Sequence, residues 1–211
     1  MRYILVLFFF LAGPVGAQPL QILAIGDSIL AWHKWTGRDI PSEMGRVLGA
    51  EVENGAVSGA RFVNASERRS VRAQYRLGAW DMVLVNGGAN DLMALCGCSN
   101  CDAVLDRLIS PNLTGVVPDF VNAVRRDGAA VIWMGYYASY RSGRFVGCRP
   151  YLVEYDARLA RLAAKTTDLQ FIDSEAAIDA RDRSLFALDG IHPSPKGARR
   201  IGTFLARAAT Q

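Results

Sequence analysis

The sequence predicts an α/β fold in which one five-stranded, doubly wound parallel sheet forms a single domain. Short apolar runs, typical of buried strands, alternate with stretches of helical periodicity. The runs occupy residues 20–25, 52–57, 80–85, 129–134 and 169–172, and the helical stretches occupy residues 42–48, 67–77, 116–126, 151–164 and 195–208. This alternation indicates parallel strands with helices on both faces. Because crossovers are right-handed, the doubly wound sheet is the simplest topology.

Residues 1–17 are predicted to be a secretory signal peptide, which leaves residues 18–211 as the folded domain. Arg2 supplies a positive start, residues 3–12 are apolar, and residues 15–17 are small. The apolar stretch is short for a membrane span, although an uncleaved leader would act as an anchor. We therefore expect an exported protein, periplasmic or extracellular, that has no stable membrane span after cleavage.

The charge of the chain selects no class of partner. The chain has 24 basic and 20 acidic residues and a net charge of +4, and removal of Arg2 with the leader leaves +3 (23 against 20). No run of Lys and Arg is longer than two residues, which gives nucleic-acid binding little support. An anionic lipid or cell-wall substrate is compatible with this balance.

Four cysteines follow the leader, and an exported protein keeps disulfides. Cys96, Cys98 and Cys101 form a cluster after the third predicted strand, and Cys148 follows the fourth. Two disulfides in one of three connectivities are expected, and a zinc site is the alternative. If the third and fourth strands are neighbours, we expect a bridge between Cys148 and one cysteine of the cluster.

The turn Gly26-Asp27-Ser28-Ile29 ends the first predicted strand. Ligands bind at the carboxyl ends of the strands in open α/β sheets, so Ser28 is a candidate nucleophile. Trp32 and Trp35 follow closely and are candidates for a substrate cleft, with loop packing as the alternative. His33 lies between them as a second, weaker candidate for a base.

The second and third predicted strands also end in glycine-rich polar loops. Gly59 lies in the loop of residues 54–60, at the end of the second strand, and can turn the backbone sharply so that its N–H faces a ligand. Asn90 and Asp91 follow two glycines after the third strand. The Asn90 amide can donate two hydrogen bonds, and we assign Asp91 the structural role of capping the next helix.

Asp189 and His192 lie three residues apart near the C-terminus, on a constrained loop. Pro193 biases His192 toward extended backbone, and Ser194 and Pro195 fit the N-cap and first position of the last helix. On such a loop the Asp189 carboxylate can accept a hydrogen bond from Nδ1–H of His192.

The four motifs described above resemble, in their order along the chain, those of the SGNH family, also called GDSL esterases and lipases. They contain Ser28, Gly59, Asn90, and the pair Asp189 and His192. The resemblance runs from Gly26 to the last helix; Ile29 replaces a commoner Leu, and the cysteine-rich insertion after Asn90 does not match. It implies a three-layer α/β/α sandwich, flavodoxin-like in its sheet, and ester hydrolysis through an acyl-enzyme. It also implies catalytic Ser28, Asp189 and His192, and an oxyanion hole of Ser28, Gly59 and Asn90. Neither a metal nor a cofactor is implied.

The substrate is the least determined expectation. We expect a monomeric hydrolase of acyl esters, acting on lysophospholipids or thioesters, whose only other reactant is water. The alternative is a carbohydrate or cell-wall O-acetyl esterase that uses aromatic side chains as sugar platforms; the candidates are Trp32, Trp35, Tyr137 and Tyr140. Arginines on the fourth-strand loop are further candidates for substrate contact, with a solvated rim as the alternative: Arg141, Arg144 and Arg149. A non-catalytic binding module is the third hypothesis.

Overall fold

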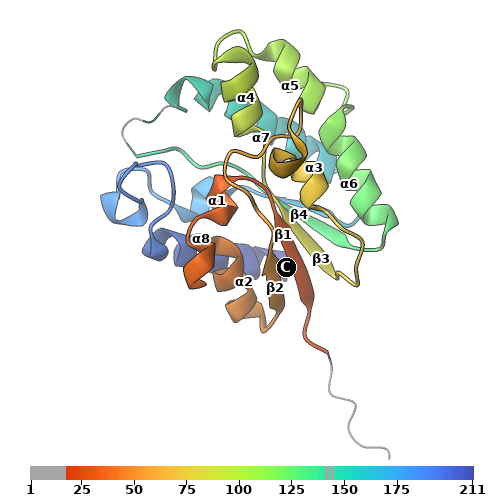
Figure 1. Cartoon of the computed structure of the whole chain (residues 1–211), viewed down its shortest axis with the longest axis vertical. Coiled ribbons are helices and arrows are strands. Elements are labelled where there is room, and N and C mark those ends of the chain that lie inside the picture. Colours follow the sequence, from red (N-terminus) through yellow and green to blue (C-terminus); the bar gives the residue numbers. More distant parts are fainter. Residues whose placement is uncertain (1–17, 141–142, 144) are drawn as a thin grey trace, which may run out of the picture.

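The computed structural model describes residues 18–140, 143 and 145–211, so the predicted leader lies outside the described residues (Figure 1). Five parallel strands form one sheet in the order β2-β1-β3-β4-β5. The strands are β1 (Gln21–Ile25), β2 (Glu51–Asn54), β3 (Met82–Val85), β4 (Ala130–Met134) and β5 (Leu169–Ile172). This is the flavodoxin-like order, and it confirms the predicted fold class.

Helices cover both faces of the sheet and make three layers (Figure 1). One layer is α2 (Ile40–Leu48) packed against α8 (Pro195–Ala209), and Gly202 permits their close approach because a Cβ there would lie 2.7 Å from the Ile40 carbonyl oxygen. The helices on the other side are α3 (Val71–Gln74), α4 (Ala89–Cys96), α5 (Asp102–Leu108), α6 (Val116–Arg126) and α7 (Arg149–Ala163).

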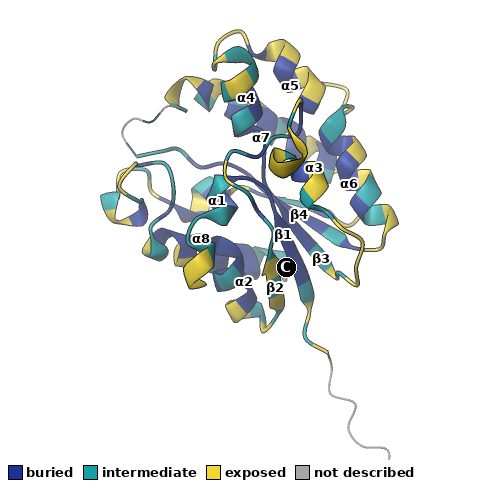
Figure 2. Cartoon of the chain, in the orientation of Figure 1, coloured by how far each residue is buried: buried dark blue, intermediate teal, exposed yellow. Residues whose placement is uncertain are grey.

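The core follows the central strands, which are buried almost throughout (Figure 2). Trp133 on β4 is fully buried and packs against Phe62 and Tyr155, with ring centroids 5.6 and 6.4 Å apart. The edge strand β2 instead alternates between exposed and half-buried residues. Deeply buried central strands give the loops at their carboxyl ends a rigid base.

Two predicted elements differ from the structure. The continuous helix over residues 67–77 is wrong: a 3₁₀ turn (Glu67–Arg69) precedes the single-turn α3. Between them the backbone bonds to Arg61, whose N–H donates to Arg69 and whose carbonyl oxygen accepts from Val71, so these groups cannot join a helix. Strand β2 ends three residues early because the Asn54 side chain accepts from the Ala56 N–H and starts the turn there.

All four cysteines form disulfides, Cys96–Cys101 and Cys98–Cys148, whose Cα atoms are 5.4 and 4.5 Å apart. The second bond confirms the predicted bridge between Cys148 and the cluster, and β3 and β4 are indeed neighbours. No thiolate is left for the zinc alternative. Of the helices in the described part of the chain, none has the length and apolar character that crossing a membrane requires.

Candidate active site

Ser28 is the first residue of α1 (Ser28–Ala31), which begins directly after β1. The turn needs glycine at position 26, where φ is +151° and a Cβ would lie 2.3 Å from Oδ1 of Asn86. The Gln74 side chain accepts from the Gly26 N–H at 2.7 Å and donates to its carbonyl oxygen at 3.0 Å. The two peptide groups that flank Gly26 are therefore held by one side chain.

Asp27, beside the serine, organises the buried polar groups of the site. Its Oδ1 accepts from the Ile29 N–H at 3.0 Å, and its Oδ2 accepts from the Tyr136 hydroxyl at 2.6 Å and from Nδ2 of Asn90 at 3.3 Å. Burial raises the pKa of Asp27, and the hydrogen bond from Tyr136 opposes that rise. Sequence reasoning missed this pair, although a carboxylate next to a buried strand end was a visible signal.

The second block forms a turn in which the Ala60 N–H donates to the Val57 carbonyl oxygen at 3.1 Å. Gly59 has φ of +76°, a conformation that favours glycine. The neighbouring Ala60 carbonyl oxygen accepts from Nδ2 of Asn90 at 3.3 Å. Hence the amide of Asn90 touches both the Gly59 turn and the serine turn.

Asn90 lies in the first turn of α4, where Gly88 is the N-cap residue and no side chain caps the helix. The expectation that Asp91 caps this helix is wrong. Its buried carboxylate accepts instead from the N–H groups of Phe62 and Val63, at 3.0 and 2.7 Å. Burial raises the pKa of Asp91 to about 6, against those hydrogen bonds. Asp91 is thus structural, and it holds the segment that follows the Gly59 turn.

His192 and Asp189 face each other on the loop before α8. Nδ1 of His192 lies 2.5 Å from Oδ2 of Asp189, and Nδ1 carries the proton because a carboxylate only accepts. Oδ1 of Asp189 accepts from the N–H groups of Ile191 and His192, both at 3.0 Å. Burial raises the pKa of Asp189, but the bonds from the His192 ring and these amides outweigh it, so the net shift is downward. Nε2 of His192 is buried, without a hydrogen-bond partner in the described residues.

The two tryptophans that follow Ser28, Trp32 and Trp35, have different surroundings. Trp32 stacks on the His192 ring, with centroids 3.9 Å apart and planes 7° apart. Trp35 is 91% exposed, and its ring contacts the Lys34 ammonium. His33 touches the edge of Trp32, and no carboxylate within the described residues bonds to its ring. Among the two histidines, only His192 therefore has the environment of a base.

A cavity of about 250 Å³ opens beside Ser28 and Asn90. Its walls are mostly apolar or aromatic and include Ile29, Tyr137, Phe145, Leu152 and Ile191. The Tyr137 hydroxyl donates to the Ile191 carbonyl oxygen at 3.0 Å and so ties the β4 exit to the histidine loop.

The other predicted substrate contacts are spread over different surroundings. Arg149 lines the cavity, whereas Arg141 and Arg144 lie outside the described residues. Tyr140 packs against Phe186, and neither Tyr140 nor Trp35 lines the cavity. The described residues contain no cluster of three His, Cys, Asp or Glu side chains that could hold a metal ion.

Comparison with known proteins identifies the family and supports the fold. The sequence profile of the GDSL-like lipase/acylhydrolase family matches residues 24–200, whereas no curated protein matches the chain. An SGNH hydrolase structure from Slackia heliotrinireducens has 22% identity and a TM-score of 0.63 over 91% of this chain and 100% of its own.

Two further structures that resemble the chain come from proteins described as carbohydrate esterases. A carbohydrate acetylesterase family member from Sinorhizobium meliloti has 16% identity and a TM-score of 0.64, over 90% of this chain and 97% of its own. An acetylxylan esterase from Geobacillus stearothermophilus has 20% identity and a TM-score of 0.63, over 90% of this chain and 92% of its own. At these identities the structures show the shared fold, and the profile match shows the family: the chain belongs to the GDSL-like lipase/acylhydrolase family of ester hydrolases.

Proposed function

We propose that the chain is a serine hydrolase of acyl esters that works through an acyl-enzyme on Ser28. The observation that carries the proposal is the state of His192. Its Nδ1 is held by Asp189, while its Nε2 is buried and has no partner in the part of the chain that the structure describes. A general base needs one nitrogen oriented and the other available.

In the first half of the reaction, His192 Nε2 takes the proton of the Ser28 hydroxyl as Oγ attacks the ester carbonyl carbon. The tetrahedral intermediate collapses when the bond to the leaving oxygen breaks, and His192 gives its proton to the departing alcohol. Asp189 keeps the ring in the required tautomer and stabilises the imidazolium. Its lowered pKa fits a carboxylate that stays charged throughout.

The negative charge on the carbonyl oxygen needs preset donors. The candidates are the backbone N–H groups of Ser28 and Gly59 and the amide of Asn90. Both contacts of Nδ2 of Asn90 measure 3.3 Å, to Asp27 and Ala60, which is long for an N–H···O bond. A shorter, charge-assisted bond to an oxyanion can replace one of them.

In the second half of the reaction, a water molecule replaces the alcohol. His192 takes one of its protons, the hydroxide oxygen attacks the acyl carbon, and the bond to Ser28 Oγ breaks. The proton on His192 returns to Oγ, and the carboxylic acid leaves. No group beyond these side chains and water is required to balance the reaction.

The cavity favours an acyl chain longer than acetyl. An apolar cavity of about 150 Å³ accommodates the six carbons of benzene, so about 250 Å³ beside Ser28 leaves room for a chain of at least that size. The first choice is accordingly a broad acyl ester hydrolase acting on lysophospholipids or thioesters. Two disulfides support export to a periplasm or beyond.

A carbohydrate O-acetyl esterase is the second candidate. Two of the similar structures are of proteins described as carbohydrate acetylesterases. In this case the exposed Trp35 and the rim residue Tyr140 would contact sugar outside the cavity, and the cavity would hold no more than the acetyl group.

The test compares the chain from Gln18 onward with its Ser28→Ala variant on p-nitrophenyl esters from acetyl to palmitoyl. We expect hydrolysis that the variant loses and that peaks at medium or long chains. Hydrolysis restricted to acetyl would select the O-acetyl esterase. Equal background rates for both proteins on every ester would refute the proposal and bring the binding module forward.

A further inference from the structure

The closest aromatic contact of the site joins the proposed base to the element that carries the proposed nucleophile. The Trp32 and His192 rings are nearly parallel, and their centroids are 3.9 Å apart. Trp32 is the C-cap of α1, and its backbone N–H donates to the Ser28 carbonyl oxygen at 2.9 Å. Ser28 and Trp32 therefore belong to the same helical turn, and the stack connects that turn to the histidine loop.

The hydrogen bonds of the loop fix His192 only partly. Asp189 accepts from Nδ1 and from the His192 backbone N–H, which sets the position of one ring nitrogen within the ring plane. Rotation about the line through that hydrogen bond would still swing Nε2 out of the plane. The indole face of Trp32 blocks this movement on one side of the ring.

The stack also has an electrostatic effect. During the proposed reaction the His192 ring becomes a cation, and an indole face attracts a cation whose centre lies within about 6 Å. The ring distance of 3.9 Å satisfies this condition. The attraction acts only while the ring is protonated, so it stabilises the charged intermediate more than the resting enzyme.

We propose that Trp32 is a positioning residue for His192: it holds the plane of the imidazole, whose Nε2 acts on Ser28 in the proposed reaction, and it stabilises the imidazolium. This inference rests on the proposed function, in which His192 is the base. It differs from the expected role of Trp32 as a sugar platform, because His192 occupies one face of the indole.

The first test is independent of activity. A protonated imidazole quenches the fluorescence of an indole stacked on it, so tryptophan emission should fall on acidification as His192 becomes charged. The fall should vanish in Trp32→Phe and in His192→Gln. It should persist in His33→Gln, since His33 meets Trp32 only edge-on at 6.2 Å. It should also persist in Trp80→Phe, because Trp80 lies two residues before β3 and its ring contacts Arg76.

The second test uses kinetics on a short p-nitrophenyl ester. We expect Trp32→Leu to lower kcat ~2- to 30-fold with little change in KM, which corresponds to the cation–π range. Trp32→Phe keeps an aromatic face and should recover part of the loss. Trp80→Phe should leave kcat unchanged, and thermal unfolding checks that each variant is folded.

Three results would overturn the inference. The first is a pH-independent emission in the wild type, or a quench that survives in His192→Gln, because either means that the rings are not stacked in solution. The second is an unchanged kcat in folded Trp32→Leu. The third is a loss confined to KM, which would make Trp32 a substrate contact. If Ser28→Ala were as active as the wild type, the proposed function would fail, while the fluorescence test would still report on the stack.

Discussion

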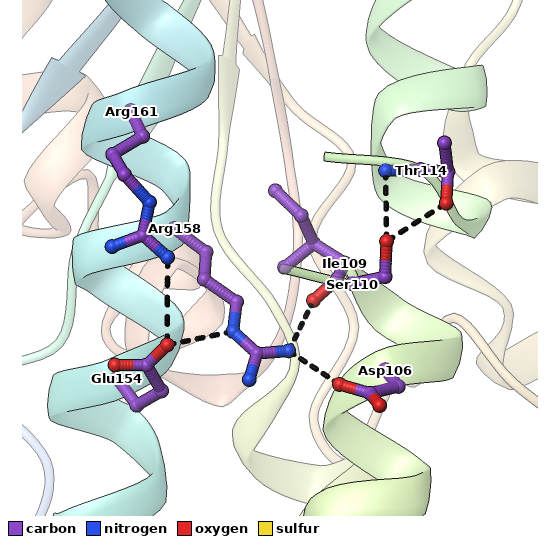
Figure 3. A network of polar contacts seen from close by, with 7 residues as sticks. All are labelled: Asp106, Ile109, Ser110, Thr114, Glu154, Arg158 and Arg161. Atoms are coloured by element: carbon purple, nitrogen blue, oxygen red, sulfur yellow. Dashed lines mark hydrogen bonds and ion pairs between the residues drawn. The ribbon is translucent and has the colours of Figure 1, made fainter. Parts of the chain in front are cut away.

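Two polar clusters of this protein, each built around a buried side chain, differ in how fully their hydrogen-bonding groups are used. The first, the Arg158 network, joins α7 to α5 (Figure 3). The Arg158 side chain is 8% exposed, and it donates to Glu154 at 2.8 Å, to Asp106 at 2.6 Å and to the Ile109 carbonyl oxygen at 2.9 Å. Arg161 also donates to Glu154 at 3.5 Å. Within the described residues, every buried polar atom of the Arg158 side chain has a hydrogen-bond partner.

The second cluster consists of Asp27, its partners Tyr136 and Asn90, and three further groups near them: Tyr155, Asp156 and His192. Several hydrogen-bonding groups of this cluster have no partner in the part of the chain that the structure describes. Within the described residues, Nε2 of His192, Oδ1 of Asp156 and the Tyr155 hydroxyl are buried and make no hydrogen bond. Such a group costs about 1–3 kcal/mol, so it is retained where something else uses it. Polar burial alone therefore does not distinguish the candidate site from the Arg158 network, whereas unused hydrogen-bonding capacity at the carboxyl ends of the strands does distinguish the two.

The largest effect should come from the histidine pair. Asp189→Asn should lower kcat ~10⁴-fold, because an amide favours the wrong tautomer of the base. The Asp189 side chain is 37% exposed, so the unfolding free energy should change little. Steady-state kinetics and urea unfolding of the same preparation measure both quantities. A variant that keeps its activity would remove Asp189 from the proposed mechanism.

The two disulfides should contribute differently to the free energy of unfolding. Cys98–Cys148 closes a loop with a sequence separation of 50, against 5 for Cys96–Cys101. Chain entropy then predicts a loss of about 4 kcal/mol for Cys98→Ser with Cys148→Ser. The same estimate gives about 2 kcal/mol for the control pair, Cys96→Ser with Cys101→Ser. Equal losses in urea unfolding would mean that loop entropy does not set these contributions.

The oxyanion assignment predicts the next effect. Asn90→Ala should lower kcat ~10²–10³-fold, or ~3–4 kcal/mol of transition-state stabilisation. KM should change little, since the bond strengthens only in the transition state. A loss of stability without a loss of kcat would reduce Asn90 to a link between the Asp27 and Gly59 turns.

Substitution in the Arg158 network should lower stability and leave the activity unchanged, the reverse of what we expect for Asn90→Ala. Arg158→Ala should cost about 2 kcal/mol of unfolding free energy, through lost packing and charged hydrogen bonds. The effect stays moderate because Asp106 and Glu154 are about half exposed and regain water. Hydrolysis of the preferred ester should be unchanged. A large fall in kcat would break the distinction between the two clusters.

A separate prediction concerns the pH dependence of stability. Burial raises the pKa of Asp156 to about 8, from an ordinary value of 3.8. The folded protein therefore holds this proton where the unfolded chain has lost it, so the contribution of the neutral carboxyl declines between about pH 4 and pH 8. Asp156→Asn should gain stability relative to the wild type across that window, measured by urea unfolding at both pH values. A constant difference would contradict the raised pKa.

Most of the sheet and much of the site could be predicted from the sequence. Strands β3 and β4 are continuous apolar runs, and α6 has the predicted bounds because Val116–Arg126 is strongly amphipathic. The helix over residues 67–77 could not be excluded, because the bridge from Arg61 that interrupts it is a tertiary contact. The pairing of Cys148 with Cys98 could not be predicted for the same reason, because it depends on where the end of α4 lies relative to the loop after β4.

Within the site, the sequence identified residues but not their partners. Asp189 and His192 are close along the chain, so their contact was predictable. The Tyr136 hydroxyl lies 109 positions from Asp27, and Trp32 meets His192 across a still longer stretch of the chain. The first contact follows from the sheet order, which places β1 and β4 on either side of β3.

The most direct measurement of the central claim is covalent labelling with a fluorophosphonate, followed by mass spectrometry of the intact and digested protein. The account predicts one adduct per chain, located on Ser28, absent in Ser28→Ala and strongly slowed in His192→Ala. An adduct on another residue, or equal labelling of the wild type and Ser28→Ala, would contradict it.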